Sequence, residues 1–203
     1  MIRWHEQFRP HPERDPSGRM TILGPVSCPA ERMQAYVRRR NPHAPEVAEL
    51  YVRVGEAYGV RGDVAFCQSV YETQAWRAAY GGPRFRPILA EVWSSGANPR
   101  VIVEEHIRCL YGFATAKGPY DEPEGGLFAP LMRKGWRGSS PYWEQLGFRW
   151  GYGTLAYGAD LVAMWRRMCE WAERNPWTMA KECTAEDRAG EDRTVEEQTE
   201  NGG

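Results

Sequence analysis

The sequence predicts a mainly α-helical domain with a short β or irregular insertion around residues 81–97. Two observations support this fold class. Between residues 29 and 174, apolar residues recur at the three- and four-residue spacing of helices, in segments separated by Gly and Pro. Strand-like alternation is scarce, and only the insertion has room for a small β element. A chain of 203 residues, 42% of them hydrophobic, is long enough to bury one core.

The first two helices are bounded by proline and glycine. Pro29 suits the first position of one helix, which Asn41-Pro42 ends. Pro45 opens the next helix, and Gly59 ends it. Their apolar faces consist of Met33, Tyr36 and Val37 in the first helix, and of Val47, Leu50, Tyr51 and Val54 in the second.

The later helices show similar start signals. Asn98-Pro99 combines an N-cap residue with a proline at the first helical position. Ser140-Pro141 begins a short helix that runs through Leu146, and the last helix covers about residues 155–174. The inward faces are Val103, Ile107, Leu110, Tyr111 and Ala114 after Asn98-Pro99, and Leu161, Trp165, Met168, Cys169 and Ala172 in the last helix.

The two ends of the chain differ in composition from the middle. Residues 1–20 hold three prolines and many charges, and we expect an extended arm. Residues 175–203 carry eight acids against three basic residues and almost no large apolar residue, which predicts a disordered acidic tail. The folded domain is therefore expected over residues 21–174.

Several function classes are disfavoured by composition. No apolar run approaches the roughly 20 residues of a membrane helix, and the N-terminus shows no signal peptide. The net charge of −1 argues against a nucleic-acid binder. The five cysteines form no C-x-x-C pair and the four histidines have no metal-ligand spacing, so we expect no metal, cofactor or disulfide framework.

A third helix, starting at residues 61–63, carries the clearest chemical signal. Residues 64–71 are apolar on nearly all sides, so this helix should be buried, and Glu72 follows directly. Burial disfavours an ionised carboxylate, and a glutamic acid that stays protonated near neutral pH suits general acid catalysis at a glycosidic oxygen. The alternative is a glutamate that surfaces at the helix end and pairs with an arginine such as Arg77.

Several blocks occur together in a characteristic order. Residues 48–73 read AELYVRVGEAYGVRGDVAFCQSVYET, preceded by Ile22-Leu23-Gly24-Pro25. Similar blocks follow at residues 99–114 and 133–150, and at Tyr152-Gly153-Thr154 with Tyr157-Gly158. Over about residues 20–170 this order resembles the glucosaminidase-domain family of peptidoglycan hydrolases (glycoside hydrolase family 73, endo-β-N-acetylglucosaminidase-like).

The resemblance implies a lysozyme-like α+β fold and cleavage of the β-1,4 bond after N-acetylglucosamine in cell-wall glycan strands. By position, Glu72 matches the catalytic acid and Tyr152 the tyrosine near the cleaved bond. A tyrosine ring packs on a sugar face, although an ordinary core tyrosine is the alternative. The substrate lies outside the membrane, so a phage particle, a lysis system or a secretion machine would deliver the protein.

The sequence leaves the second carboxylate and the sugar-binding residues less certain in identity than Glu72. A second carboxylate is expected, with Glu91 in the insertion favoured over Glu104, Glu105 and the loop acids Asp121, Glu122 and Glu124. Tyr71, Trp76 and Trp93 are candidate sugar-stacking residues, with packing at helix junctions as the alternative.

One block departs from the family pattern. Many members carry Asn-Phe-x-Gly-Ile after the catalytic acid, whereas residues 87–93 here read PILAEVW, without the asparagine and glycine. This departure motivates a second hypothesis, a catalytically weakened or inactive glycan-binding or structural component of a wall-associated or phage assembly. A third is an adaptor whose acidic tail binds a basic partner.

Overall fold

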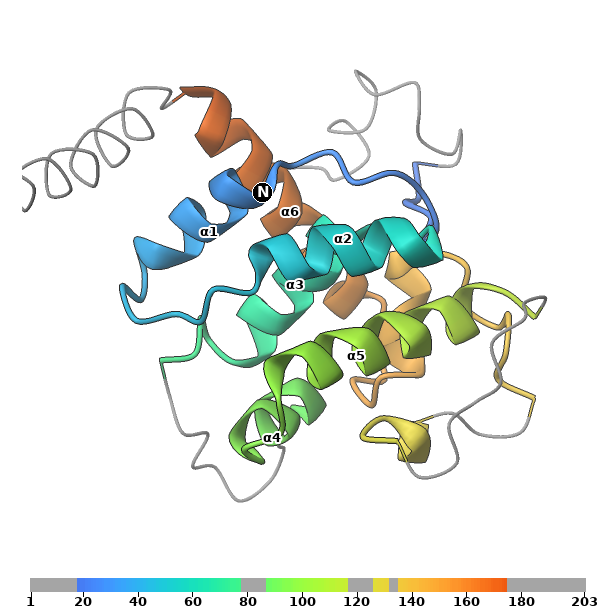
Figure 1. The fold of residues 1–203 in the computed structure, drawn as a ribbon. Coiled ribbons are helices and arrows are strands. Elements are labelled where there is room, and N and C mark those ends of the chain that lie inside the picture. Colours follow the sequence, from blue (N-terminus) through green and yellow to red (C-terminus); the bar gives the residue numbers. More distant parts are fainter. Residues whose placement is uncertain (1–17, 78–86, 117–125, 132–134, 175–203) are drawn as a thin grey trace, which may run out of the picture.

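The computed structural model describes residues 18–77, 87–116, 126–131 and 135–174. The prediction of a mainly helical domain is confirmed in this part of the chain (Figure 1). Its β structure is limited to two isolated bridges, Thr21 with Tyr142 and Leu23 with Val60. The elements in order are α1 (Ala30–Arg38), α2 (Ala48–Tyr58), α3 (Gly62–Glu72), α4 (Ile88–Ser94), α5 (Pro99–Ala114), η2 (Ala129–Leu131), η3 (Trp143–Phe148) and α6 (Ala156–Arg174).

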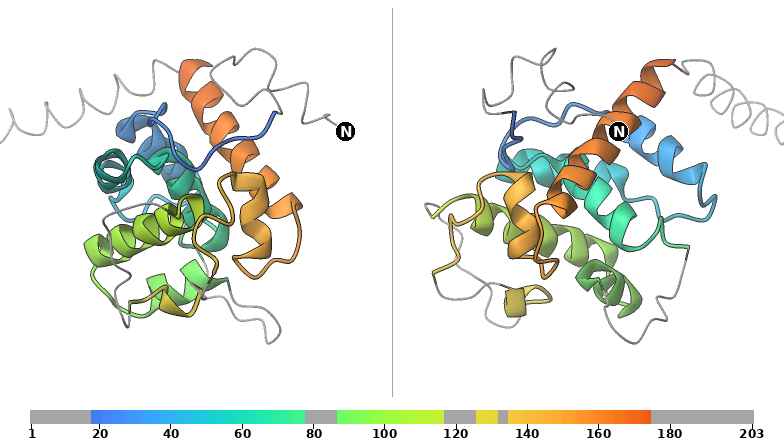
Figure 2. Two further views of the ribbon diagram at one scale, coloured as in Figure 1. Left: turned by 90° about the vertical axis from the view of Figure 1, so that its right-hand side faces the viewer. Right: turned by 180° about the vertical axis from the view of Figure 1, so that it is seen from behind.

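Helix α3 is the centre of the fold. It packs against α1, α2, α4, α5 and α6, and two further views show it surrounded by these helices (Figure 2). Every residue from Gly62 to Val70 is buried, as the apolar run predicted. A helix buried on all sides can carry a side chain at its end into the interior of the molecule.

Two glycines bring the backbones of α2 and α3 into contact. A Cβ atom on Gly62 would lie 2.0 Å from the carbonyl oxygen of Tyr51, and one on Gly55 would lie 2.7 Å from Cα of Gly62. Gly59 then ends α2 in the left-handed conformation, with φ of 66°, as predicted. This close contact fixes α3 relative to Tyr51, which matters for the site described below.

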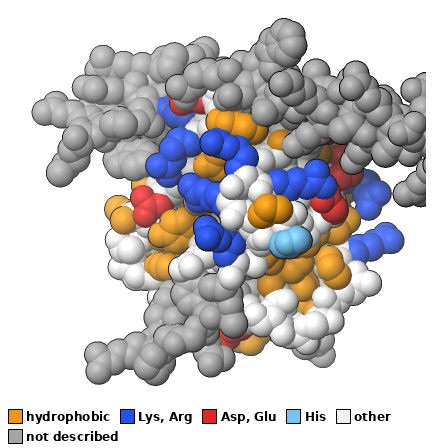
Figure 3. Space-filling view, turned by 90° about the vertical axis from the view of Figure 1, so that its left-hand side faces the viewer, with side chains coloured by type: hydrophobic (Ala, Val, Ile, Leu, Met, Phe, Trp, Pro, Cys, Tyr) orange, Lys and Arg blue, Asp and Glu red, His pale blue; other side chains and the backbone are white. Residues whose placement is uncertain are grey.

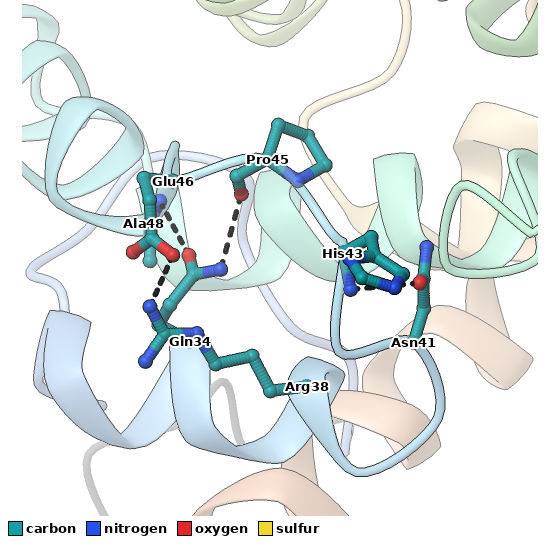
Figure 4. Close-up of polar contacts among 7 residues, drawn as sticks. All are labelled: Gln34, Arg38, Asn41, His43, Pro45, Glu46 and Ala48. Atoms are coloured by element: carbon teal, nitrogen blue, oxygen red, sulfur yellow. Dashed lines mark hydrogen bonds and ion pairs between the residues drawn. The ribbon is translucent and has the colours of Figure 1, made fainter.

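A buried amide connects α1 to the start of α2 (Figure 4). Gln34 donates to the carbonyl of Pro45 over 3.1 Å and accepts from the N–H of Ala48 over 3.4 Å. The N–H of Val47 also donates to the Pro45 carbonyl, in a turn. Helix α2 therefore begins at Ala48, three residues later than predicted, because the turn at Pro45 precedes it.

The segment predicted as a β or irregular insertion contains a helix instead. We expected a short β or irregular element around residues 81–97, and the structure has helix α4 at Ile88–Ser94, while residues 81–86 lie outside the described residues. Pro87 is extended, with φ of −58° and ψ of 134°, and precedes the helix. Leu89 and Val92, three residues apart, are both buried, so helical spacing determines this segment.

The C-terminal part of the fold depends on a second pair of glycines. The short element after Ser140-Pro141 is a 3-10 helix from Trp143 to Phe148, and α6 begins close to its predicted start. A Cβ atom on Gly158 would lie 1.8 Å from the carbonyl oxygen of Trp143, and one on Gly147 would lie 2.0 Å from that of Thr154. Of the predicted inward face of α6, Leu161, Trp165 and Met168 are buried and Cys169 is half-buried.

The predicted arm and tail fall mostly outside the described residues. Residues 1–17 of the predicted arm and residues 175–203, the whole predicted tail, lie outside the described residues. Met20, predicted as the last residue of the arm, is 1% exposed and belongs to the core. Its N–H donates to the Glu144 carboxylate over 3.2 Å, so the folded domain includes residue 20.

Arginine side chains gather on the side of the molecule where α1 lies (Figure 3). Arg38, Arg39 and Arg40 are exposed at the end of α1. Arg39 lies over the Trp171 ring at 5.0 Å, and Arg38 forms an ion pair with Glu46.

Among the helices described, none combines the length and apolar character that a membrane span requires.

Candidate functional site

Glu72, the last residue of α3, is buried, with 1% of its surface exposed. Its Oε2 atom accepts a hydrogen bond from the N–H of Leu89 over 2.8 Å, and its Oε1 atom accepts one from the Tyr157 hydroxyl. The alternative of a surface glutamate paired with Arg77 is therefore wrong. The carboxylate lies where α3, α4 and α6 meet.

Burial raises the pKa of Glu72 from its ordinary 4.5 to about 7. Desolvation is the largest cause, because the ionised form loses its water. Tyr157, the N–H of Leu89, Trp150 and Gln68 lower the pKa and offset part of this effect. The buried Trp150 N–H lowers the pKa of Glu72 although it forms no hydrogen bond of normal geometry. Near neutral pH, both the acid and the carboxylate are populated.

An unusual turn follows Glu72. Gln74, Ala75 and Trp76 all have φ between 51° and 60°, the left-handed region that residues other than glycine seldom adopt. The hydroxyl of Thr73 accepts from the N–H of Trp76 over 3.0 Å. The Asn41 amide donates to the carbonyls of Ala75 over 2.9 Å and Trp76 over 3.2 Å. Backbone strain of this kind concentrates at functional sites, and here it directs Trp76 toward α4.

Tyr152 is connected to Glu72 through a second tyrosine. Its half-buried ring stacks on Tyr157, with ring centroids 3.9 Å apart and an interplanar angle of 12°. Tyr71, also half-buried, meets the same Tyr157 ring edge-on at 5.7 Å. The structure thus brings Tyr71 and Tyr152 together around Tyr157. Tyr157 belongs to one of the blocks on which the resemblance rests, but sequence reasoning assigned it no role in the site.

The two predicted tryptophans form a pair of their own. Trp76 and Trp93 are half-buried and meet edge-on, with centroids 5.3 Å apart. The Trp93 N–H donates to the Ser69 hydroxyl over 3.2 Å, and Trp76 also contacts the Phe66 ring. Both rings pack against the core, which agrees with the packing alternative, and each keeps a partly exposed surface.

The predicted second carboxylate does not join Glu72 in the described structure. Glu91 is exposed on α4, and no described hydrogen bond or ion pair connects it to Glu72. Glu104 and Glu105 are half-buried on α5, where Glu105 accepts from the N–H of Leu127. Residues 117–125, with the three loop acids, lie outside the described residues. Among those described, no group of three or more His, Cys, Asp and Glu could hold a metal ion.

His106 is fully buried on α5. Its Nδ1 atom lies 3.0 Å from the Tyr51 hydroxyl and its Nε2 atom 3.0 Å from Oε1 of Gln68. Desolvation lowers the pKa of His106 from 6.5 to about 3, so the ring is neutral at ordinary pH. Gln68 in turn donates to the Tyr157 hydroxyl over 2.8 Å, which links His106 to Glu72.

The site therefore combines a buried acid that titrates near neutral pH with a stacked tyrosine pair and two half-buried tryptophans. Such an arrangement is suited to exchange of a proton beside aromatic rings, in a setting of low polarity. No family model, no curated protein and no solved structure matches this chain.

Proposed function

We propose that the chain is a lysozyme-like glycoside hydrolase that cleaves the β-1,4 bond after N-acetylglucosamine in peptidoglycan, with Glu72 as general acid. The observation that carries this proposal is the buried Glu72 carboxyl, whose pKa of about 7 keeps a transferable proton available near neutral pH. A general acid works best when its pKa lies near the working pH. The resemblance of the sequence blocks supplies the substrate class.

The neighbours of Glu72 suit both states of a general acid. Once the proton has passed to the glycosidic oxygen, Glu72 is negatively charged and needs hydrogen-bond donors. The Leu89 N–H and the Tyr157 hydroxyl are donors already directed at its two oxygens. The donor that stays in place when substrate binds stabilises the carboxylate that proton transfer creates, which lowers the free energy of the charged state.

Substrate access requires a change around the carboxylate. Glu72 is 1% exposed, so a glycosidic oxygen must take the place of one of its two present donors. Either the start of α4, which carries Leu89, or the Tyr157 side chain must therefore move. Tyr152 covers Tyr157 and remains half-buried, so it is the side chain that a sugar ring approaching Tyr157 would meet.

Two groups are candidates for the base or nucleophile that works opposite Glu72. Glu91 lies two residues after Leu89 on α4 and is exposed, so a movement of α4 that uncovers Glu72 would also move Glu91. An N-acetyl group of the substrate is the other available nucleophile, because retaining hydrolysis does not then need a second enzyme carboxylate. Loss of activity in Glu91→Gln would favour the first of these.

The test is digestion of purified peptidoglycan, with identification of the sugar at the new reducing end. Wild type should release fragments ending in N-acetylglucosamine. Glu72→Gln should lose about 10²–10⁴-fold in rate, the contribution of general acid catalysis. Glu56→Gln, at an exposed position of α2, is the matched control and should cleave at the wild-type rate. Equal rates for Glu72→Gln and wild type would refute the assignment.

A second candidate function is a non-catalytic glycan-binding or structural component at the bacterial cell wall. The observation that favours it is the enclosure of Glu72, whose two oxygens both accept hydrogen bonds from the protein. The departure from the family pattern at residues 87–93 points the same way. In this case wild type and Glu72→Gln would sediment equally with insoluble peptidoglycan, and neither would release fragments.

A further inference from the structure

A continuous chain of hydrogen bonds crosses the interior from α4 to Glu72. It begins at the half-buried Trp93 and passes through side chains of α2, α3, α5 and α6 that are all buried. The links are Trp93 Nε1 to Ser69 Oγ (3.2 Å), Ser69 Oγ to Tyr51 Oη (2.6 Å), Tyr51 Oη to His106 Nδ1 (3.0 Å), His106 Nε2 to Gln68 Oε1 (3.0 Å), Gln68 Nε2 to Tyr157 Oη (2.8 Å), and Tyr157 Oη to Glu72 Oε1.

The groups at the two ends of this chain can only donate. The Trp93 indole N–H donates to Ser69, and the Leu89 N–H donates to Oε2 of Glu72. Every link between them joins groups that can either donate or accept: two tyrosine hydroxyls, a serine hydroxyl, an amide and a neutral imidazole. The positions of their hydrogens are therefore set by the ends of the chain.

When Glu72 is ionised, all donors point toward it. Tyr157 donates to the carboxylate and accepts from the Gln68 amide. The Gln68 oxygen then accepts from His106, which must carry its hydrogen on Nε2. The bare Nδ1 atom accepts from Tyr51, whose oxygen accepts from Ser69.

When Glu72 is protonated, the order reverses. Its Oε2 atom faces the Leu89 N–H, so the added hydrogen sits on Oε1 and points at the Tyr157 oxygen. Tyr157 must then donate to Gln68, whose amide turns by half a turn and presents its NH₂ group to His106. The Nε2 atom now accepts, so the ring hydrogen lies on Nδ1 and points at Tyr51.

We propose that Gln68 and His106 are positioning residues for Glu72, and that protonation of Glu72 reverses this chain and moves the ring hydrogen of His106 from Nε2 to Nδ1. One proton enters from solvent and remains on Glu72. Each hydroxyl keeps its single hydrogen and rotates, and the amide keeps both of its hydrogens. The His106 ring exchanges its proton with water during brief local openings, losing the hydrogen on Nε2 and gaining one on Nδ1, so it stays neutral with one N–H. The hydrogen count rises by one, at Glu72 alone.

The other titratable groups around the chain are consistent with this reversal. Tyr51 from α2, and Tyr157 with its stacked neighbour Tyr152, are the ones that face it. Burial raises the pKa of Tyr51 and Tyr157, so both remain hydroxyls near neutral pH. From α1 and α4, no described charged side chain forms a hydrogen bond or ion pair with Glu72 or His106. Glu72 is then the group whose proton changes near neutral pH.

The same logic makes Glu72→Gln a permanent copy of the protonated state. The Leu89 N–H requires an acceptor, so the amide oxygen of the new side chain must face it. The NH₂ group then faces Tyr157 and donates, as a protonated carboxyl does. His106 should therefore carry its hydrogen on Nδ1 at every pH in this variant.

The experiment is nitrogen NMR of the full chain labelled with ¹⁵N-histidine, without substrate, between pH 5 and 9. A protonated and a bare ring nitrogen resonate at well-separated frequencies, which identifies the tautomer. The His106 signals are assigned by removing the other histidines one at a time, in His5→Gln, His11→Gln and His43→Gln. In wild type we expect the Nδ1–H form at low pH and the Nε2–H form at high pH, with a midpoint near 7 that matches Glu72.

Two variants make the outcome decisive. Glu72→Gln should show the Nδ1–H form throughout. Tyr157→Phe keeps the ring on Tyr152 but removes the connecting hydroxyl, so the His106 tautomer should no longer follow pH. A wild-type tautomer that stays unchanged while the carboxyl of Glu72 titrates in carbon NMR would overturn the proposal, as would the Nε2–H form in Glu72→Gln.

The reversal is a property of the resting protein, and only its catalytic consequence rests on the proposed function. A protein that shows the tautomer change but cleaves no peptidoglycan would keep this inference and lose the hydrolase assignment. A protein that cleaves peptidoglycan through Glu72 while His106 keeps one tautomer would do the opposite.

Discussion

Helix α3 carries a buried acid in its first turn and another as its last residue, and the two have different partners. Asp63 is fully buried, and its Oδ2 atom accepts from the N–H groups of Ser27 (2.9 Å) and Cys28 (3.0 Å) and from the Trp165 indole (2.7 Å). Its Oδ1 atom accepts from the N–H of Val64. Glu72, equally buried, accepts from one peptide N–H and one tyrosine hydroxyl.

The difference lies in what the partners can do. Four N–H groups can only donate, so Asp63 must be an acceptor at every contact, and it connects the segment before α1 to α6. The Tyr157 hydroxyl can donate or accept, so Glu72 can be satisfied both with and without a proton. Two carboxyls with similar burial on one helix are thus suited to different tasks, one to connecting segments and the other to proton exchange.

The largest expected effect is on stability, in Asp63→Asn. The amide cannot accept all four hydrogen bonds, and bonds to a charged acceptor are worth about 1.5–3 kcal/mol each. We expect the free energy of unfolding to fall by roughly 4 kcal/mol, measured by chemical denaturation at pH 8. Asp160→Asn, at a half-buried position of α6, is the control. A loss below about 1 kcal/mol would show that the N–H groups find other acceptors.

Glu72→Gln should act on stability in the opposite direction, and only at higher pH. Between pH 4.5 and 7 the folded protein holds a proton on Glu72 that the unfolded chain has released. The wild type should therefore lose about 3 kcal/mol of stability as pH rises through this range, whereas the variant has no proton to lose there. Chemical denaturation at pH 4, 6 and 8 should show that the free energy of unfolding of the variant, relative to wild type, rises by that amount between pH 4 and pH 8.

His106 explains why the variant must be compared with wild type at each pH. Its pKa falls from 6.5 to about 3 on folding, so its contribution to stability is present above pH 6.5 and is lost as pH falls toward 3. In wild type this slope opposes that of Glu72 between pH 4.5 and 6.5. The difference between the two proteins removes the His106 slope. If that difference is flat with pH, the Glu72 carboxyl is not perturbed by burial.

Tyr152→Phe separates chemistry from packing on the Glu72 side. The change removes one hydroxyl and leaves a ring that still stacks on Tyr157. Under the proposed function we expect peptidoglycan cleavage to fall about tenfold, equivalent to about 1.4 kcal/mol of barrier, with a smaller loss of stability. Tyr58→Phe, on α2, is the control. Equal activity in Tyr152→Phe and wild type would make Tyr152 an ordinary packing residue.

The smallest expected effect concerns the backbone after Glu72. Gln74 is exposed and has φ of 51°, which costs an L-residue roughly 1–2 kcal/mol. Gln74→Gly should therefore raise the free energy of unfolding by up to about 1 kcal/mol, after the entropy lost by glycine is subtracted. Glu56→Gly, within α2, should lower it by about 1 kcal/mol. A loss in both variants would mean that the left-handed turn is not strained.

Local patterns in the sequence predicted the helices well where no distant residue intervenes. The apolar run at residues 64–71, Gly59 as a helix end and Asn98 as an N-cap are all confirmed, and the Asn98 side chain accepts from the N–H of Arg100 over 2.9 Å. The insertion was predicted wrongly because it was treated as the one segment with room for a small β element, although Leu89 and Val92 have helical spacing.

The surroundings of Glu72 were only partly accessible to sequence reasoning. Burial of the acid followed from the helix that precedes it. Its partners Leu89 and Tyr157 lie 17 and 85 residues away in sequence, and no periodicity connects such positions. His106 occupies the buried face of α5 because the hydroxyl of Tyr51 and the amide of Gln68 satisfy its two nitrogens there, and no local pattern predicts such partners.

The contact between Gly158 and the carbonyl of Trp143 has a consequence for redesign of this chain. No side chain fits at position 158 or at position 147, so a mutant library aimed at thermal stability should hold both residues constant. The same contact also offers a way to shift Tyr157, the residue before Gly158. A methyl group at position 158 would push α6 away from η3 and carry Tyr157 with it, without altering a polar atom. An engineer could thus adjust the distance between Tyr157 and Glu72 without changing either of these two side chains.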